Sequence, residues 1–120
     1  MILVDSSVWI GHFRRTNAQL VALLHDGRVL CHRFVLGELA LGNLRNRTVI
    51  LEHLSALPTA VVAEHEEVLT LVEGRRLAGT GIGWIDAHLL ASAMLSHARI
   101  WTLDAALAAQ GRRLGVGATA

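Results

Sequence analysis

The chain has 120 residues, of which 52% are hydrophobic, and a formal net charge of +1 at pH 7. This length fits one domain with a sizeable core, and so high a hydrophobic fraction indicates an apolar surface for a partner or a second copy. All 11 basic residues are arginines, which excludes Schiff-base chemistry and Walker-type phosphate loops, because both need lysine. The single cysteine, Cys31, allows no internal disulfide and fits a cytoplasmic location. We expect neither a signal peptide nor a membrane span.

Short apolar runs alternate with helical patterns along the chain, which predicts an α/β fold with a mainly parallel central sheet flanked by helices. In chain order, the pattern predicts a strand at 2–4, helices at 6–13 and 16–25, a strand at 28–31, helices at 34–42 and 48–57, a further strand at 60–63, a helix at 64–77, a loop, a helix at 84–98, a strand at 100–103 and a helix at 104–114. The Gly- and Ala-rich tail beyond 114 is expected to be frayed. Without linkers or repeats, residues 1–120 are predicted to form one domain.

Four of the ten acidic residues lie where a purely structural role explains them poorly. Asp5 and Asp104 each follow an apolar strand, in "ILVD" and "IWTLD", where either could instead cap the next helix. Glu38 lies among apolar residues and glycines in "VLGELALG", which does not suit a solvated helix face. Asp86 lies in the first turn of an otherwise apolar helix, where it could instead stabilise the helix dipole.

The predicted topology brings these four carboxylates together. The carboxyl ends of parallel strands share one edge of the sheet, so Asp5 and Asp104 are expected at that edge, with Glu38 and Asp86 on helices that start near it. Converging carboxylates repel one another unless a cation lies between them. Oxygen ligands without His or Cys favour Mg²⁺ or Mn²⁺, and such an ion activates water and stabilises charge on a phosphate. The sequence therefore predicts a metal site there.

The stretches "ILVDSSVWI", "LGELALG", "GIGWIDAHLLASAML" and "IWTLDAAL" together resemble the PIN-domain ribonucleases, most closely the VapC-type toxins of bacterial toxin–antitoxin pairs. The resemblance covers nearly the whole chain in order. It implies an Mg²⁺- or Mn²⁺-dependent endoribonuclease that hydrolyses RNA phosphodiester bonds. By this resemblance, the metal-binding and catalytic residues are Asp5, Glu38, Asp86 and Asp104, with Ser7 and Thr102 as supporting hydroxyls.

The same resemblance implies a homodimer and an antitoxin protein that wraps the surface and occupies the acidic groove. The chain departs from many family members after Asp104, where it reads "AALAAQ" in place of a further acidic or basic residue. Other enzymes with carboxylates on a parallel sheet, the phosphorelay receivers and haloacid-type phosphatases, rely on a lysine that is absent here. The alternative that stays open is a PIN fold that serves as a binding module, or an inactive toxin without nuclease activity.

Because lysine is absent, contacts with RNA phosphates are expected from arginine, whose planar guanidinium binds two oxygens at once. The candidates follow the first helix and the Glu38 helix, and are Arg14, Arg15, Arg45 and Arg47. A plain solvated position is the alternative for each of them. Among the tryptophans, Trp84 and Trp101 are expected in the core and Trp9 on a partner surface.

Overall fold

Within the described residues, the sheet has three parallel strands. The computed structural model describes residues 1–118, in which β1 (Ile2–Val4), β2 (Val29–Leu30) and β3 (Arg99–Trp101) pair in the order β2-β1-β3. Leu3 of the middle strand is in register with Leu30 on one side and Ile100 on the other. β1, the first strand in the chain, therefore lies at the centre of the sheet. Its carboxyl end, at Val4, leads directly into Asp5.

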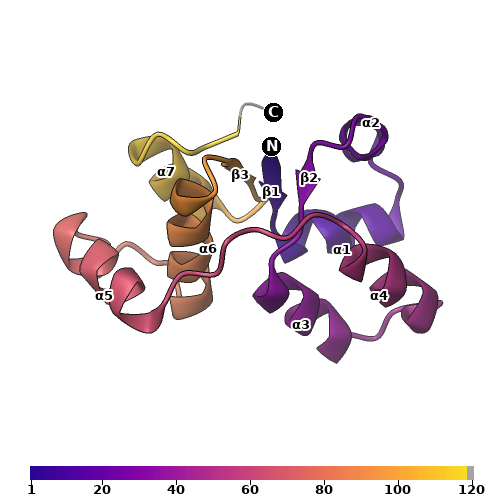
Figure 1. Cartoon of the computed structure of the whole chain (residues 1–120), viewed down its shortest axis with the longest axis horizontal. Coiled ribbons are helices and arrows are strands. Elements are labelled where there is room, and N and C mark those ends of the chain that lie inside the picture. The colour runs from indigo at the N-terminus through magenta and orange to yellow at the C-terminus, as the bar shows by residue number, and fades with distance from the viewer. Residues whose placement is uncertain (119–120) are drawn as a thin grey trace.

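Helices connect and flank these strands. Their bounds are α1 (Ser6–Arg14), α2 (Ala18–His25), α3 (Arg33–Leu41), α4 (Arg47–Ser55), α5 (His65–Gly74), α6 (Trp84–Leu95) and α7 (Ala105–Arg113). In Figure 1, α5, α6 and α7 lie on the side of β3, whereas α2, α3 and α4 lie on the side of β2. The predicted α/β fold is thus confirmed. Within the described residues, no helix is both long and apolar enough to span a membrane.

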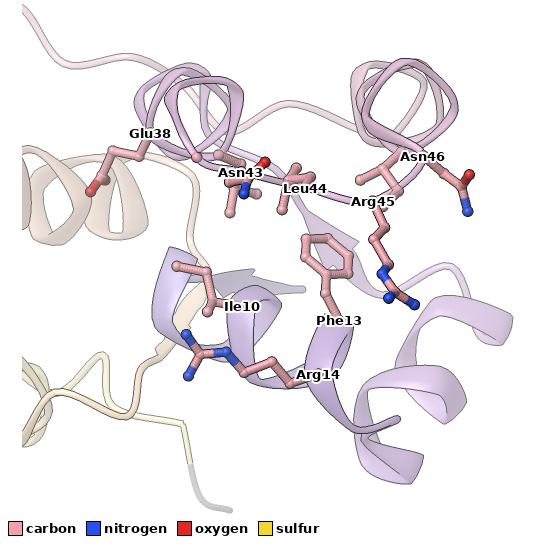
Figure 2. Close-up of a pocket in the computed structure, with 11 residues that line it drawn as sticks. Ile10, Phe13, Arg14, Glu38, Asn43, Leu44, Arg45 and Asn46 are labelled. Carbon is pink, nitrogen blue, oxygen red and sulfur yellow. The ribbon is translucent and has the colours of Figure 1, made fainter.

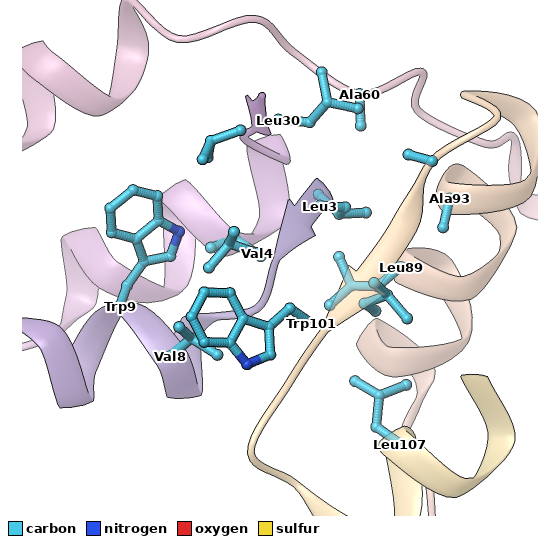
Figure 3. Close-up of a cluster of buried hydrophobic side chains, with 14 of the residues drawn as sticks. Leu3, Val4, Val8, Trp9, Leu30, Ala60, Leu89, Ala93, Trp101 and Leu107 are labelled. Atoms are coloured by element: carbon cyan, nitrogen blue, oxygen red, sulfur yellow. The ribbon is translucent and has the colours of Figure 1, made fainter. Parts of the chain in front are cut away.

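The core covers both faces of the sheet. Leu3 and Val4 are each 0% exposed, and consecutive strand residues point to opposite faces, so neither face is open to solvent. Figure 3 shows side chains from α1, α6 and α7 packed around the strands, among them Trp9, Leu89 and Leu107. Each fully buried side chain of this size contributes about 1.5–3 kcal/mol. This packing fixes the positions from which the polar residues at the strand ends project.

The predicted strand at 60–63 is wrong. Thr59 makes a single parallel bridge with Cys31, and the backbone N–H of Ala60 donates to the Cys31 carbonyl at 2.9 Å, but pairing stops there. The reason is packing: Ala63 turns away from the sheet and joins a second apolar cluster, with Val68 of α5 and Ala87 of α6. The apolar run therefore serves the contact between two helices. Cys31 itself is buried, as expected.

The tail beyond α7 is held in place as far as the structure describes it, so the prediction of fraying is wrong for 115–118. The Ile100 N–H donates to the Val116 carbonyl at 2.7 Å, and the Ala118 N–H donates to the Ile100 carbonyl at 2.9 Å. The tail thereby continues the hydrogen bonding of β3 on its outer edge. The last two residues of the predicted frayed segment lie outside the described residues.

Two of the three tryptophan predictions are also wrong. Trp9 is only 2% exposed and belongs to the core, whereas Trp84 is 40% exposed. Trp84 opens α6, where its ring centroid lies 5.0 Å from that of His65 and 5.0 Å from that of His88. Trp101 is 8% exposed, as expected.

Candidate active site

Asp5 lies at the carboxyl end of the middle strand and is buried, with 6% of its surface exposed. It occupies the N-cap position of α1, yet its side chain caps no helix N–H. Its Oδ2 instead accepts hydrogen bonds from Ser7 Oγ at 2.7 Å and from Thr102 Oγ1 at 2.8 Å. Both hydroxyls donate to the same oxygen, and Oδ1 accepts no hydrogen bond from residues 1–118. One oxygen of Asp5 is thus used by the protein and the other is available.

The two hydroxyls connect Asp5 to the loop that carries Asp104. Ser7 Oγ accepts from the Leu103 N–H at 3.0 Å, and Thr102 Oγ1 accepts from the Asp104 N–H at 3.0 Å. The bond between Thr102 and Asp5 joins residues 97 positions apart in the chain. The supporting role predicted for these hydroxyls stays a prediction, but their placement between the two aspartates is what that role requires.

Asp104 and Asp86 each accept a backbone hydrogen bond at the start of a helix, which is the structural role that the sequence left open as an alternative to metal binding. Asp104 Oδ1 accepts from the Leu107 N–H at 2.9 Å and caps α7, while Asp86 Oδ2 accepts from the Gly83 N–H at 3.1 Å at the start of α6. Each bond occupies only one oxygen. Within the described part of the chain, Asp104 Oδ2 and Asp86 Oδ1 accept no hydrogen bond. Capping therefore orients both carboxylates and leaves one oxygen of each unused.

Glu38 projects from the middle of α3, and its side chain is exposed. The sequence argument that a solvated position suits Glu38 poorly is wrong in this respect. Its pKa is nevertheless raised, first by partial burial of the carboxyl group and then by the negative charges of Asp5 and Asp86. This electrostatic influence brings Glu38 into the same site as the buried aspartate.

The pKa of Asp86 is raised as well. Partial burial is the largest cause, the Gly83 N–H bond acts in the opposite direction, and the charges of Asp5 and Asp104 raise the pKa further. Glu38 and Asp86 therefore each lie close enough to two other carboxylates for those negative charges to disfavour their ionised form. Such mutual repulsion is what a bound cation relieves.

The cluster is open. Among residues 1–118, no three His, Cys, Asp or Glu side chains lie close enough together to enclose a metal ion. Mg²⁺ commonly keeps several water ligands and is bound by one or two carboxylates together with substrate phosphate. The donors here are all carboxylate oxygens, and each aspartate keeps one oxygen unused. This chemistry fits a hydrated divalent cation better than a closed metal cage.

A buried histidine, which sequence reasoning missed, holds the two helices of the site together. His32 is 0% exposed, and its Nδ1 accepts from the Phe34 N–H at 3.0 Å at the start of α3. The proton then lies on Nε2, which donates to Ser92 Oγ of α6 at 2.9 Å. Burial, followed by the charges of His88 and Arg33, lowers the pKa of His32 to about 4. A neutral hydrogen bond thus sets α3, with Glu38, against α6.

A cavity of about 830 Å³ begins at Glu38 and runs between α1 and the connection from α3 to α4. Arg14 and Arg45 line it, and Figure 2 shows them extending from opposite walls. Arg15 does not line it, and the Arg47 guanidinium donates to the Ala40 carbonyl at 2.7 and 3.1 Å, which fixes the connection. Two of the four predicted arginines therefore line this cavity, and their contact with RNA stays a prediction.

Comparison of the whole sequence with known proteins identifies the family of this chain. The sequence model of the PIN domain matches residues 2–112. The chain belongs to the PIN-domain family. Two relatives of this PIN domain are named Ribonuclease VapC32, from Mycobacterium tuberculosis strains CDC 1551 / Oshkosh and ATCC 25618 / H37Rv. Each is 50% identical over 117 residues, which cover 97% of this chain and 94% of the relative. The resemblance to VapC-type PIN ribonucleases is thereby confirmed.

Proposed function

We propose that this PIN domain is a divalent-metal-dependent endoribonuclease and the toxin of a toxin–antitoxin pair. The observation that carries the proposal is the convergence of four carboxylates at one end of a parallel sheet. Two of them have raised pKa values, so the arrangement costs free energy in the metal-free protein. A pure binding module gains nothing from that cost. The identity to two ribonucleases over nearly the whole chain supports the same activity.

The residues proposed to hold the metal are Asp5, Glu38, Asp86 and Asp104, and the oxygen-only set favours Mg²⁺ or Mn²⁺. When bound, such an ion lowers the pKa of a coordinated water and offsets the charge that develops on the phosphate. Ser7 and Thr102 fix the orientation of Asp5 through their bonds to Oδ2.

The predicted partners are RNA, an antitoxin protein and a second copy of the chain. Exposed apolar side chains support a partner surface: Leu41 is 91% exposed, Val49 is 52% exposed, and Leu103, between Thr102 and Asp104, is 64% exposed. Leu103 places apolar surface directly beside the carboxylates, where an inhibitor would cover both. The homodimer stays a prediction, and light scattering coupled to gel filtration tests it.

The deciding experiment is cleavage of total cellular RNA by the purified protein with Mg²⁺ or Mn²⁺. Wild type is compared with wild type in EDTA and with Asp5→Asn, which keeps an oxygen to accept the two hydroxyl bonds but removes the charge. Asp26→Asn is the matched control, because Asp26 is an exposed residue at the end of α2. We expect discrete fragments from wild type and from the control only when metal is present. Retained cleavage by Asp5→Asn would overturn the site assignment. A folded wild type that neither binds metal nor cleaves RNA would support the binding-module alternative.

A further inference from the structure

We propose that the cavity between α1 and the α3–α4 connection (residues 42–46) binds one unpaired nucleotide of the RNA beside the scissile phosphate, with its base against Phe13. This inference rests on the proposed function, because it assigns part of the substrate to a place next to the carboxylates. Glu38, one of the four residues proposed to hold the metal, lines one end of the cavity. A nucleotide in the cavity therefore lies next to the cluster.

The size and shape of the cavity suit a nucleotide. Its volume of about 830 Å³ lies within the usual range for small-ligand sites. Figure 2 shows the Phe13 ring entering it from α1. The same ring stacks on Trp9, with 6.1 Å between ring centroids and 28° between ring planes, and Trp9 is buried. Phe13 is only partly buried. A ring fixed from behind offers a ready surface on which an unstacked base can lie.

The charges around the cavity favour a nucleic acid over a basic peptide. The Arg14 and Arg45 guanidinium groups lie on either side of the Phe13 ring (Figure 2). Both side chains are exposed, and neither donates a side-chain hydrogen bond to another residue in 1–118, in contrast to the anchored Arg47. Two such cations on either side of an aromatic ring match the two phosphates that flank one nucleotide. A basic peptide would meet repulsion at the same place.

Asn43 supplies the means to distinguish bases. It is exposed, lines the cavity, and lies between Glu38 and Leu44 in Figure 2. A side-chain amide offers two donors and one acceptor oxygen, which can pair with the edge of a base that is splayed out of a stack. The cavity therefore predicts a base preference at one position adjacent to the cleaved bond, set by Asn43 and Phe13.

The first test measures binding without cleavage. Fluorescence anisotropy follows labelled single-stranded RNA oligonucleotides of four base compositions with wild-type protein in EDTA. Phe13→Leu is expected to weaken binding roughly tenfold, the effect of losing one base stack. Phe34→Leu is the matched control, because Phe34 is the only other phenylalanine and does not line the cavity. Thermal unfolding checks that both variants are folded.

Arg15, the neighbour of Arg14 in the chain, provides a matched control for phosphate binding by Arg14. Arg14→Gln and Arg15→Gln remove the same charge at the same helix end, but only Arg14 lines the cavity. The slope of log affinity against log salt is expected to become less steep by about 0.7 for Arg14→Gln, the value for one lost phosphate contact on a single strand. An unchanged slope for Arg14→Gln, or an equal change for both variants, would count against the cavity as the phosphate-binding surface.

The second test reads the sequence around each cut by sequencing the ends of cleaved RNA. Phe13→Leu and Asn43→Ala are expected to relax the base preference at one position, whereas Phe34→Leu is expected to leave it unchanged. Binding that depends on Phe13, without cleavage by any sample, would refute the proposed function and support the pocket. Equal binding and equal cut profiles for Phe13→Leu and Phe34→Leu would overturn the inference and leave the cavity to a protein partner.

Discussion

Replacing Thr102 by Val tests whether the hydroxyls around Asp5 stabilise the site. The change keeps the branched shape of the side chain and removes only the hydroxyl. Thr102 Oγ1 donates to Asp5 Oδ2 at 2.8 Å and accepts from the Asp104 N–H at 3.0 Å. A hydrogen bond to a charged group contributes about 1.5–3 kcal/mol, and Asp5 is too deeply buried, at 6% exposed, for water to replace it easily. The hydrogen bond from the Asp104 N–H to Thr102 Oγ1 contributes less to the free energy of unfolding, because it lies at an exposed position.

We therefore expect Thr102→Val to lower the free energy of unfolding by about 2–3 kcal/mol in EDTA at neutral pH. Thr80→Val is the matched control, because the Thr80 hydroxyl donates to the uncharged Leu77 carbonyl at 2.6 Å. That neutral bond contributes about 0.5–1.5 kcal/mol. Urea unfolding followed by circular dichroism measures both values. Thr102→Val is thus expected to cost about 0.5–2.5 kcal/mol more than its control.

The same variant has a functional readout. With its orienting hydroxyl gone, Asp5 is expected to bind Mn²⁺ more weakly, and Thr102→Ser is expected to restore most of the affinity because the hydroxyl returns. Calorimetric titration with Mn²⁺ measures this. The reasoning is refuted if Thr102→Val and Thr80→Val lower the free energy of unfolding equally, since the Asp5 bond would then have no special strength.

Three further predictions follow from the buried and charged groups. In EDTA, Asp86→Asn is expected to be about 0.5–1 kcal/mol more stable than wild type at pH 8, a value that allows for solvent screening. The raised pKa means that folding favours the protonated acid, so this gain should disappear near pH 3, as urea unfolding at the two pH values can check. Ser92→Ala leaves the buried His32 Nε2–H without its acceptor and should cost about 1–3 kcal/mol in the same assay, whereas Ser55→Ala, at an exposed helix position, should cost less. Burial lowers the pKa of His32 from 6.5 to about 4. The contribution of neutral His32 to the free energy of unfolding is therefore complete above pH 6.5 and should be lost as the pH falls toward 4. Urea unfolding at a series of pH values measures this loss, and the assignment is contradicted if Ser92→Ala leaves the pH dependence of the unfolding free energy unchanged and NMR finds His32 charged at pH 6.

The placement of Asp5 and Asp104 could be predicted because it depends on topology alone. Each carboxylate follows an apolar strand, and parallel strands end at one edge, so knowing the strands is enough to bring the two residues together. The helices were likewise predictable, within a few residues at their ends. Asn17, for example, caps α2 by accepting from the Leu20 N–H at 3.0 Å, one position after the predicted start of that helix.

Other features depend on contacts that no local pattern records. The 60–63 run has the composition of a strand, but Ala63 packs with α5 and α6, and the choice between the two is made by the rest of the fold. Trp84 is large and apolar, yet its place in the first turn of α6 leaves it 40% exposed. The cavity joins Phe13 to Asn43 across two separate elements. The bond from His32 to Ser92 spans 60 positions.

The position of β1 in the middle of the sheet also affects the order in which the protein becomes active during translation. The ribosome makes β1 early, but one of its two neighbours, β3, begins only at Arg99. Until then Asp5 has no Thr102 hydroxyl, and the carboxylate cluster has no Asp104. A nascent chain that ends before this segment therefore carries an incomplete site, and a cell synthesising the proposed nuclease meets its activity only after the last strand has been added.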